Sequence, residues 1–266
     1  MDLYLTTIFL LILLGFLTGT LSVIAGIGGG VFFVSIMVLL FSLPINIAID
    51  TSTFIILTSS CAGFITYLKQ ERTNFKLALT FGVFSILGSV LATILFLFIQ
   101  IDNSMLKILF ALTLLVAGLN MIHKAIKTKG GLTSKDLEKG EFSLHDYDYK
   151  TNLKKAIPLF ILAGFVANLL GIGGGIINTP SLNIILGFPI HNATAISTSI
   201  IFFTAIYNTI IKCLLGQIDY LVGLLITTGA ILGSIFGAKI SRKISKTYLK
   251  FFVAVILLVL AIRMFF

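Results

Sequence analysis

Charged residues, cysteine and tryptophan are scarce in this sequence. Of its 266 residues, 11% are charged and 58% are hydrophobic, whereas a soluble domain carries about 25% charged residues. This composition excludes a water-soluble globular domain and indicates a polytopic membrane protein. The two cysteines, Cys61 and Cys213, form no CxxC pair, which argues against a disulfide framework and a thiolate metal site. Tryptophan is absent, so tyrosines are the expected anchors at the membrane surface. These candidate anchors are Tyr4, Tyr67, Tyr220 and Tyr248.

Catalytic and metal-binding patterns are missing too. The three histidines are scattered, and the apolar segments hold no Ser-His-Asp, HExxH or paired-carboxylate arrangement. We therefore expect a protein that is not an enzyme, with no catalytic residue, no metal and no cofactor. The formal net charge is +9, but the basic residues are spread over loops. Nucleic-acid binding needs a clustered basic patch, so no nucleic-acid partner is expected.

A glycine-rich stretch occurs twice within apolar sequence, at 26–30 and at 171–175, and reads Gly-Ile-Gly-Gly-Gly both times. Each glycine costs about 1 kcal/mol relative to alanine inside a helix, and lipid offers no water to replace a lost backbone hydrogen bond. The two stretches are therefore predicted to interrupt membrane helices and to expose backbone groups that the protein uses.

The glycine stretches belong to a longer internal repeat with an offset of about 145 residues. At this offset Pro44 matches Pro189, and Gly88-Ser89 matches Gly233-Ser234. Such a repeat predicts two related halves: residues 1–127 as a first membrane repeat, 128–153 as a polar cytoplasmic linker, and 154–266 as a second membrane repeat.

The apolar segments predict an all-α polytopic membrane protein. We expect about 8–10 hydrophobic helices, including a short half-helix after each glycine break. Asn46 is the expected cap of one helix, and Asn178-Thr179-Pro180 reads as a cap followed by proline at the first helical position. Basic loops at 69–76, in the linker and at 239–247 are assigned to the cytoplasm. The halves then form an inverted-topology repeat, and both termini are external.

These features resemble the TauE/SafE sulfite-exporter family, also called the 4-toluene sulfonate uptake permease (TSUP) family. The resemblance rests on the Gly-x-Gly-Gly-Gly motif of each half, on Pro180 downstream of the second, and on the Ser-Thr step after each short segment. It implies a multi-pass plasma-membrane transporter of small anions such as sulfite, sulfoacetate or sulfonates. The first half departs from the pattern, because Ser35 stands where Pro180 stands in the second.

The backbone amides after each break are predicted to cradle the anion, because a helix N-terminus attracts negative charge and glycine lets a ligand approach closely. Repeat-related hydroxyls are predicted to line the same space. The alternatives are close helix packing for the glycines and bonds to backbone carbonyls for the hydroxyls. The candidate substrate-binding residues are Gly28, Gly29, Gly30, Ser52, Thr53, Gly173, Gly174, Gly175, Asn178, Thr179, Ser197 and Thr198.

Asp50 has no counterpart in the second half, where Ala195 stands. It is a candidate for coupling transport to a proton or sodium ion, and the alternative is a place at the membrane surface. Lys212 is expected at the surface as well.

The favoured interpretation is a secondary transporter of a small anion that works by alternating access, with its site between the two discontinuous helices. An intramembrane enzyme and an anion channel are the alternatives. The expected partners are the lipid bilayer, the anion, a coupling ion and, in a homodimer, a second copy of the chain.

Overall fold

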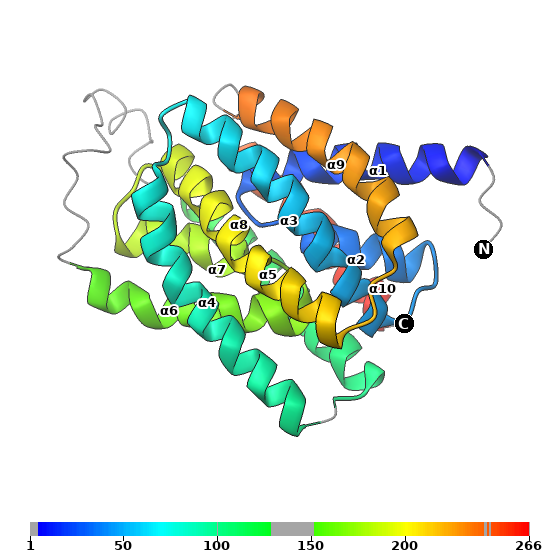
Figure 1. Ribbon diagram of the computed structural model, residues 1–266. Helices are drawn as coiled ribbons and strands as arrows, with labels where there is room; N and C mark the ends of the chain where they lie inside the picture. Colours follow the sequence, from blue (N-terminus) through cyan, green and yellow to red (C-terminus); the bar gives the residue numbers. More distant parts are fainter. Residues whose placement is uncertain (1–4, 100, 129–151, 242–243, 245, 266) are drawn as a thin grey trace.

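A computed structural model describes residues 5–99, 101–128, 152–241, 244 and 246–265. Its elements are all helical in these ranges, which confirms the predicted all-α class (Figure 1). Seven of the described helices are long and apolar enough to cross a membrane. The first half contains α1 Leu5–Ala25, α2 Gly30–Leu39, α3 Ile45–Lys69, α4 Phe75–Phe98 and α5 Asn103–Thr128. The second contains α6 Leu153–Leu170, α7 Gly175–Pro180, the π-helix η2 Ser181–Ile185, α8 Ile190–Leu215, α9 Tyr220–Ile240 and α10 Lys246–Phe265. Most of the linker predicted at 128–153 lies outside the described residues.

Helices α3 and α8 form the centre of the bundle. They pack against each other, and each also packs against the fourth helix of the opposite half, α3 on α9 and α8 on α4. The first helix of each half also packs against the fourth helix of the opposite half, α1 on α9 and α6 on α4 (Figure 1). Helices α5 and α10 pair with each other. The two halves are therefore interleaved rather than side by side. The contacts are also symmetric: if each helix is replaced by its counterpart in the other half, the same set of contacts results.

Small residues allow the interleaved helices to touch through their backbones. Where α4 crosses α6, a methyl group built on Gly88 would overlap the carbonyl oxygen of Ile161, and one on Gly164 would overlap that of Ser85. Large apolar side chains instead cover the outside of the bundle; Phe98 and Leu5 are examples. This distribution is the one expected of helices that pack closely inside and face lipid outside.

Two predicted caps are wrong. Helix α7 begins at Gly175, with Gly174 as its N-cap in a left-handed conformation (φ 75°), so Asn178 lies inside the helix and Pro180 at its end. The positive φ of the glycine, and not an Asn side chain, sets where the helix begins. Beyond Pro180, which has no N–H for the helical ladder, the chain continues as η2. Helix α3 likewise begins after Pro44, and Asn46 lies within its first turn.

Candidate functional site

The two glycine stretches adopt the same local structure. The first break, residues 26–29 between α1 and α2, has positive φ at Gly26, Gly28 and Gly29 (67°, 100° and 73°). The second break, residues 171–174 between α6 and α7, has positive φ at the three related glycines Gly171, Gly173 and Gly174 (65°, 84° and 75°). Side chains rarely tolerate this conformation. The repeated glycines therefore build two copies of one tight turn.

The two breaks meet in the interior of the protein. A methyl group built on Gly28 would lie 3.0 Å from the carbonyl oxygen of Ile172 and 3.2 Å from the Cα of Gly173. The reciprocal methyl group on Gly173 would lie 3.2 Å from the Cα of Gly28. The backbone of one half thus lies against that of the other at the predicted site.

A serine from the opposite half holds each break. Ser197 on α8 donates to the carbonyl oxygen of Gly26 (2.8 Å), and the repeat-related Ser52 on α3 donates to that of Gly171 (2.8 Å). Thr179 gives Gly26 a second donor at 2.8 Å. These three predicted site residues are therefore brought to the breaks, and in this conformation their hydroxyls contact glycine carbonyls.

The other predicted residues differ in their surroundings. Thr53 donates to the Asp50 carbonyl oxygen (2.7 Å) and Thr198 to that of Thr194 (3.0 Å), both within their own helix. Asn178 is fully buried just after the second break, and neither polar atom of its amide has a hydrogen-bond partner within the described residues. A buried amide without partners is rare, so Asn178 is the predicted residue whose polar groups the described structure leaves unsatisfied.

A cavity of about 420 Å³ opens between the start of α3 and the ends of α4, α6 and α8. We call it the polar cavity. Its polar lining residues are Asn46, Asp50, Thr93, Asn168 and Lys212. Asn168 donates to the hydroxyl of Thr93 (2.8 Å), while its own Oδ1 accepts no hydrogen bond from the described part of the chain.

An ion pair lies in the wall of the polar cavity. Lys212 Nζ on α8 is 2.9 Å from Asp50 Oδ1 on α3, and the two side chains are only 12% and 11% exposed. The other carboxylate oxygen of Asp50 accepts from the backbone N–H of Gln217 (3.0 Å). The ammonium group of Lys212 also lies 4.5 Å from the ring centroid of Phe96. Both charges are thus largely buried, and they lie near the start of α3 and the end of α8; their expected place at the membrane surface stays a prediction. In the sequence, the rarity of ionisable residues within apolar spans singles out Asp50 and Lys212, but it does not reveal that the two form an ion pair.

A second, much smaller cavity lies beside the second break. It measures about 10 Å³, room for roughly one water molecule, and its lining includes Thr53, Ala167, Gly173 and Asn208. Thr53 and Asn208 lie about one helical turn from Asp50 and Lys212, respectively. The Oδ1 atom of Asn208 has no partner among the described residues. Polar groups therefore follow α3 and α8 from the polar cavity down to the second break.

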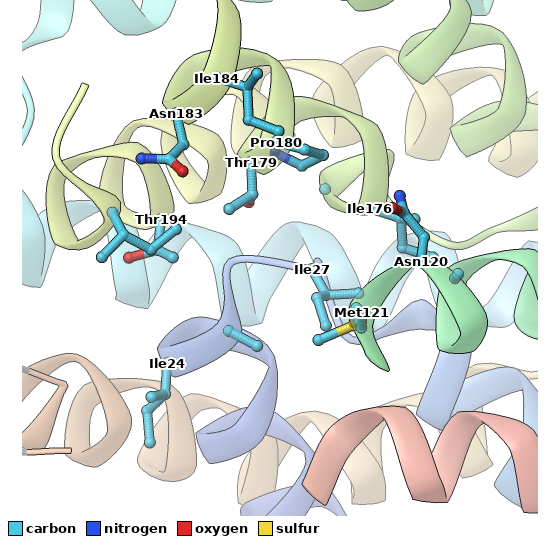
Figure 2. A pocket seen from close by; sticks show the side chains of 14 residues that line it. Ile24, Ile27, Asn120, Met121, Ile176, Thr179, Pro180, Asn183, Ile184 and Thr194 are labelled. Carbon is cyan, nitrogen blue, oxygen red and sulfur yellow. The ribbon is translucent and has the colours of Figure 1, made fainter. Parts of the chain in front are cut away.

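Another pocket, of about 70 Å³, lies beside the first break and between α5, α7 and the start of α8 (Figure 2). Its polar side chains include Thr179, Asn183 and Thr194, and each of these donates to a nearby carbonyl. Ile24, Ile27 and Ile176 supply apolar surface (Figure 2). This pocket carries no charge and suits a small anion less well than the polar cavity does.

Metal and nucleophile chemistry find little support in the described residues. They contain no group of three or more His, Cys, Asp or Glu side chains that could hold a metal ion. Cys61 and Cys213 are free thiols on α3 and α8.

Comparisons with known proteins agree with this architecture. The family model for "Sulfite exporter TauE/SafE" matches residues 11–264. "Probable membrane transporter protein YunE" of Bacillus subtilis is 26% identical over 237 residues, which cover 84% of this chain and 85% of the relative. "Probable membrane transporter protein MJ0441" of Methanocaldococcus jannaschii is 31% identical over 203 residues, 74% of this chain and 69% of the relative. No solved structure matches the chain significantly. From the match over nearly its whole length, the chain belongs to the sulfite exporter TauE/SafE family of membrane transporters.

Proposed function

We propose that this protein is a secondary transporter that moves sulfite, a sulfonate or a related small organic anion across the plasma membrane by alternating access. One observation carries the proposal. A polar cavity with a lysine at its wall and a smaller cavity at the second glycine break lie about one helical turn apart along α3 and α8, and the second break touches the first. In the proposed cycle the anion takes a path along these helices to the backbone of the two breaks, where the predicted cradle lies.

The repeat supports alternating access, because it relates the polar cavity to a closed region. At the offset of 145 residues, Asp50, Thr93, Asn168 and Lys212 correspond to Ala195, Ala238, Val23 and Tyr67. The latter four form one buried hydrophobic cluster, which we call the closed cluster. One end of the path is thus open and its repeat-related counterpart is shut.

Polar contacts hold the closed cluster in place. The hydroxyl of Tyr67 donates to the carbonyl oxygen of Val23 (2.9 Å), and the guanidinium of Arg72 lies 4.6 Å from the Tyr67 ring centroid. Arg72 is 2% exposed and donates to Ser241 (3.3 Å) at the end of α9 and to the His191 carbonyl at the start of α8. In the proposed cycle these contacts break when the polar cavity closes.

The opposite course of α3 and α8 in Figure 1 supports an inverted arrangement of the halves. In that arrangement the closed cluster, near the basic loop at 69–76, faces the cytoplasm, and the polar cavity faces outward. Both termini are then external.

Flux measurements test the proposed function. Purified protein in proteoliposomes should take up radiolabelled sulfite or methanesulfonate in chemically unchanged form. External unlabelled anion should accelerate the release of labelled anion from loaded vesicles. An altered product would support an intramembrane enzyme instead, and flux without saturation or exchange would support a channel.

Cysteine labelling tests alternating access separately. In a background that carries Cys61→Ser and Cys213→Ser, Thr93→Cys should react quickly with a small membrane-impermeant thiol reagent from outside. The repeat-related Ala238→Cys should react at least about tenfold more slowly from either side, because Ala238 is fully buried. Equal reaction of the two positions would contradict the open and closed assignment.

A further inference from the structure

The ion pair of Asp50 and Lys212 breaks the symmetry of the molecule. It joins the two central helices, yet the related positions of the closed cluster hold Ala195 and Tyr67. Charges within membrane spans are costly, and a mostly buried ion pair seldom stabilises a fold more than apolar side chains would. Stability therefore gives little reason for the pair to exist, whereas a ligand that exchanges with one of its members does.

The charges around the pair are balanced. Among the residues that line the polar cavity, Asp50 and Lys212 are the ionisable ones. The nearby carboxylate of Asp219 caps α9 by accepting from Val222, and the backbone N–H of Asp219 donates to Thr51. The ammonium group of Lys212 also faces the ring of Phe96 on α4, and this ring carries no charge. A monovalent anion that binds Lys212 therefore leaves one uncompensated negative charge beside it, unless Asp50 takes up a proton.

Building on the proposed transport function, we infer that Lys212 is the counter-charge for a small monovalent oxyanion and that Asp50 carries one coupled proton. The anion replaces Asp50 at the ammonium group, and a proton from the surrounding water adds to the released carboxylate oxygen. One anion and one proton bind together, so the net charge of the site does not change. The other oxygen of Asp50 keeps its hydrogen bond from the Gln217 N–H, which holds the protonated side chain beside the anion.

The neutral residues of the cavity fit this ligand. Asn168 and Asn46 line the cavity, and their buried amide oxygens accept no hydrogen bond from the described residues. These oxygens can accept a hydrogen bond from the protonated carboxyl group of Asp50, from a hydroxyl group of the oxyanion or from water bound to the oxyanion. The site thus combines one cation for the negative charge with acceptors for its protons.

Binding of methanesulfonate to the purified protein tests the inference without requiring transport. Methanesulfonate has a single negative charge at any pH near neutrality, so protons taken up during binding report on the protein. We expect the wild type to bind it with about one proton, measured by calorimetry in two buffers of different ionisation enthalpy. Asp50→Asn, which resembles the protonated side chain, should bind at least as tightly and without proton uptake.

Charge variants complete the test. Lys212→Gln should weaken binding at least tenfold, while Lys212→Arg retains it. The control Lys107→Gln, which removes a lysine outside the cavity, should change affinity less than twofold. Binding that is unaffected by Lys212→Gln, unchanged proton uptake in Asp50→Asn, or no binding to the wild type would each overturn the inference. Sulfite flux that persists in any of these cases would leave the proposed function intact, and absent flux with intact proton-linked binding would refute transport alone.

Discussion

The two serines that hold the glycine breaks should contribute unequally to stability, although the repeat relates them. The carbonyl oxygen of Gly26 accepts from both Ser197 and Thr179, whereas that of Gly171 has Ser52 as its described donor. Ser52→Ala therefore leaves a buried carbonyl without a donor. After Ser197→Ala, the carbonyl oxygen of Gly26 still accepts from Thr179.

The magnitudes follow from the cost of unsatisfied polar groups. A buried acceptor without a partner costs about 1–3 kcal/mol, and the loss of one ordinary hydrogen bond costs about 0.5–1.5 kcal/mol. Ser52→Ala should thus destabilise the protein by about 1–3 kcal/mol and Ser197→Ala by less. For a chain of this size, each kcal/mol lowers the melting temperature by roughly 2–4 °C. Combining Ser197→Ala with Thr179→Val should destabilise the protein by more than the sum of the two single changes, because only the double variant leaves the carbonyl oxygen of Gly26 without a donor.

Thermal unfolding in one detergent, followed by intrinsic tyrosine fluorescence, measures this series. Ser59→Ala is a matched control, because Ser59 is buried on the same helix as Ser52 and bonds only within that helix, to Ile56 at 3.2 Å. Its melting temperature should stay close to that of the wild type. Equal losses for Ser52→Ala and Ser197→Ala, or strict additivity in the double variant, would refute the assignment of these hydroxyls to the breaks.

Three further substitutions probe the breaks and the closed end. Gly28→Ala should cost about 1–3 kcal/mol and abolish sulfite flux, since its φ of 100° disfavours a side chain and its methyl group would press on the second break; Gly223→Ala, which meets only side chains, should be tolerated. Tyr67→Phe, which removes the hydrogen bond at the closed cluster, should speed thiol labelling there severalfold, and unchanged labelling would show that the hydroxyl does not keep this end shut. Arg72→Gln should cost about 1.5–3 kcal/mol in thermal unfolding, and Arg72→Lys should rescue little of it because an ammonium group lacks the planar fork of guanidinium.

Sequence predicted the breaks well because their cause is local. Glycine at three related positions favours positive φ, and that conformation interrupts a helix wherever it occurs. The all-α class likewise follows from the apolar spacing, and the equivalence of Ser52 and Ser197 follows from the repeat. The division into two inverted membrane repeats and the roles of the predicted site residues stay predictions.

Contacts between the halves could not be read from the sequence. The partner of Ser52 is a carbonyl in the other half, and the partner of Lys212 is a carboxylate that the repeat does not duplicate. Both depend on how α3 and α8 pack, which apolar periodicity does not specify. The cap at Asn178 failed for a related reason, since the N-cap is Gly174 in the left-handed conformation, four residues before the position that the side-chain pattern suggested.

The two ends of the proposed path differ in charge, and this difference bears on how ligand binding and closure are linked in the proposed cycle. An alternating transporter needs two states of similar free energy, and a ligand shifts them only through a difference in affinity. Closing the polar cavity removes water from Asp50 and Lys212, which is costly for charges that are not well compensated. With an oxyanion on Lys212 and a proton on Asp50, the lysine stays paired and the carboxyl group is neutral, so the closed cavity again holds no net charge. The closed cluster needs no such compensation, because Tyr67 and its apolar neighbours are already dry. In the proposed cycle the charged end is open in the empty protein and closes when anion and proton are bound together.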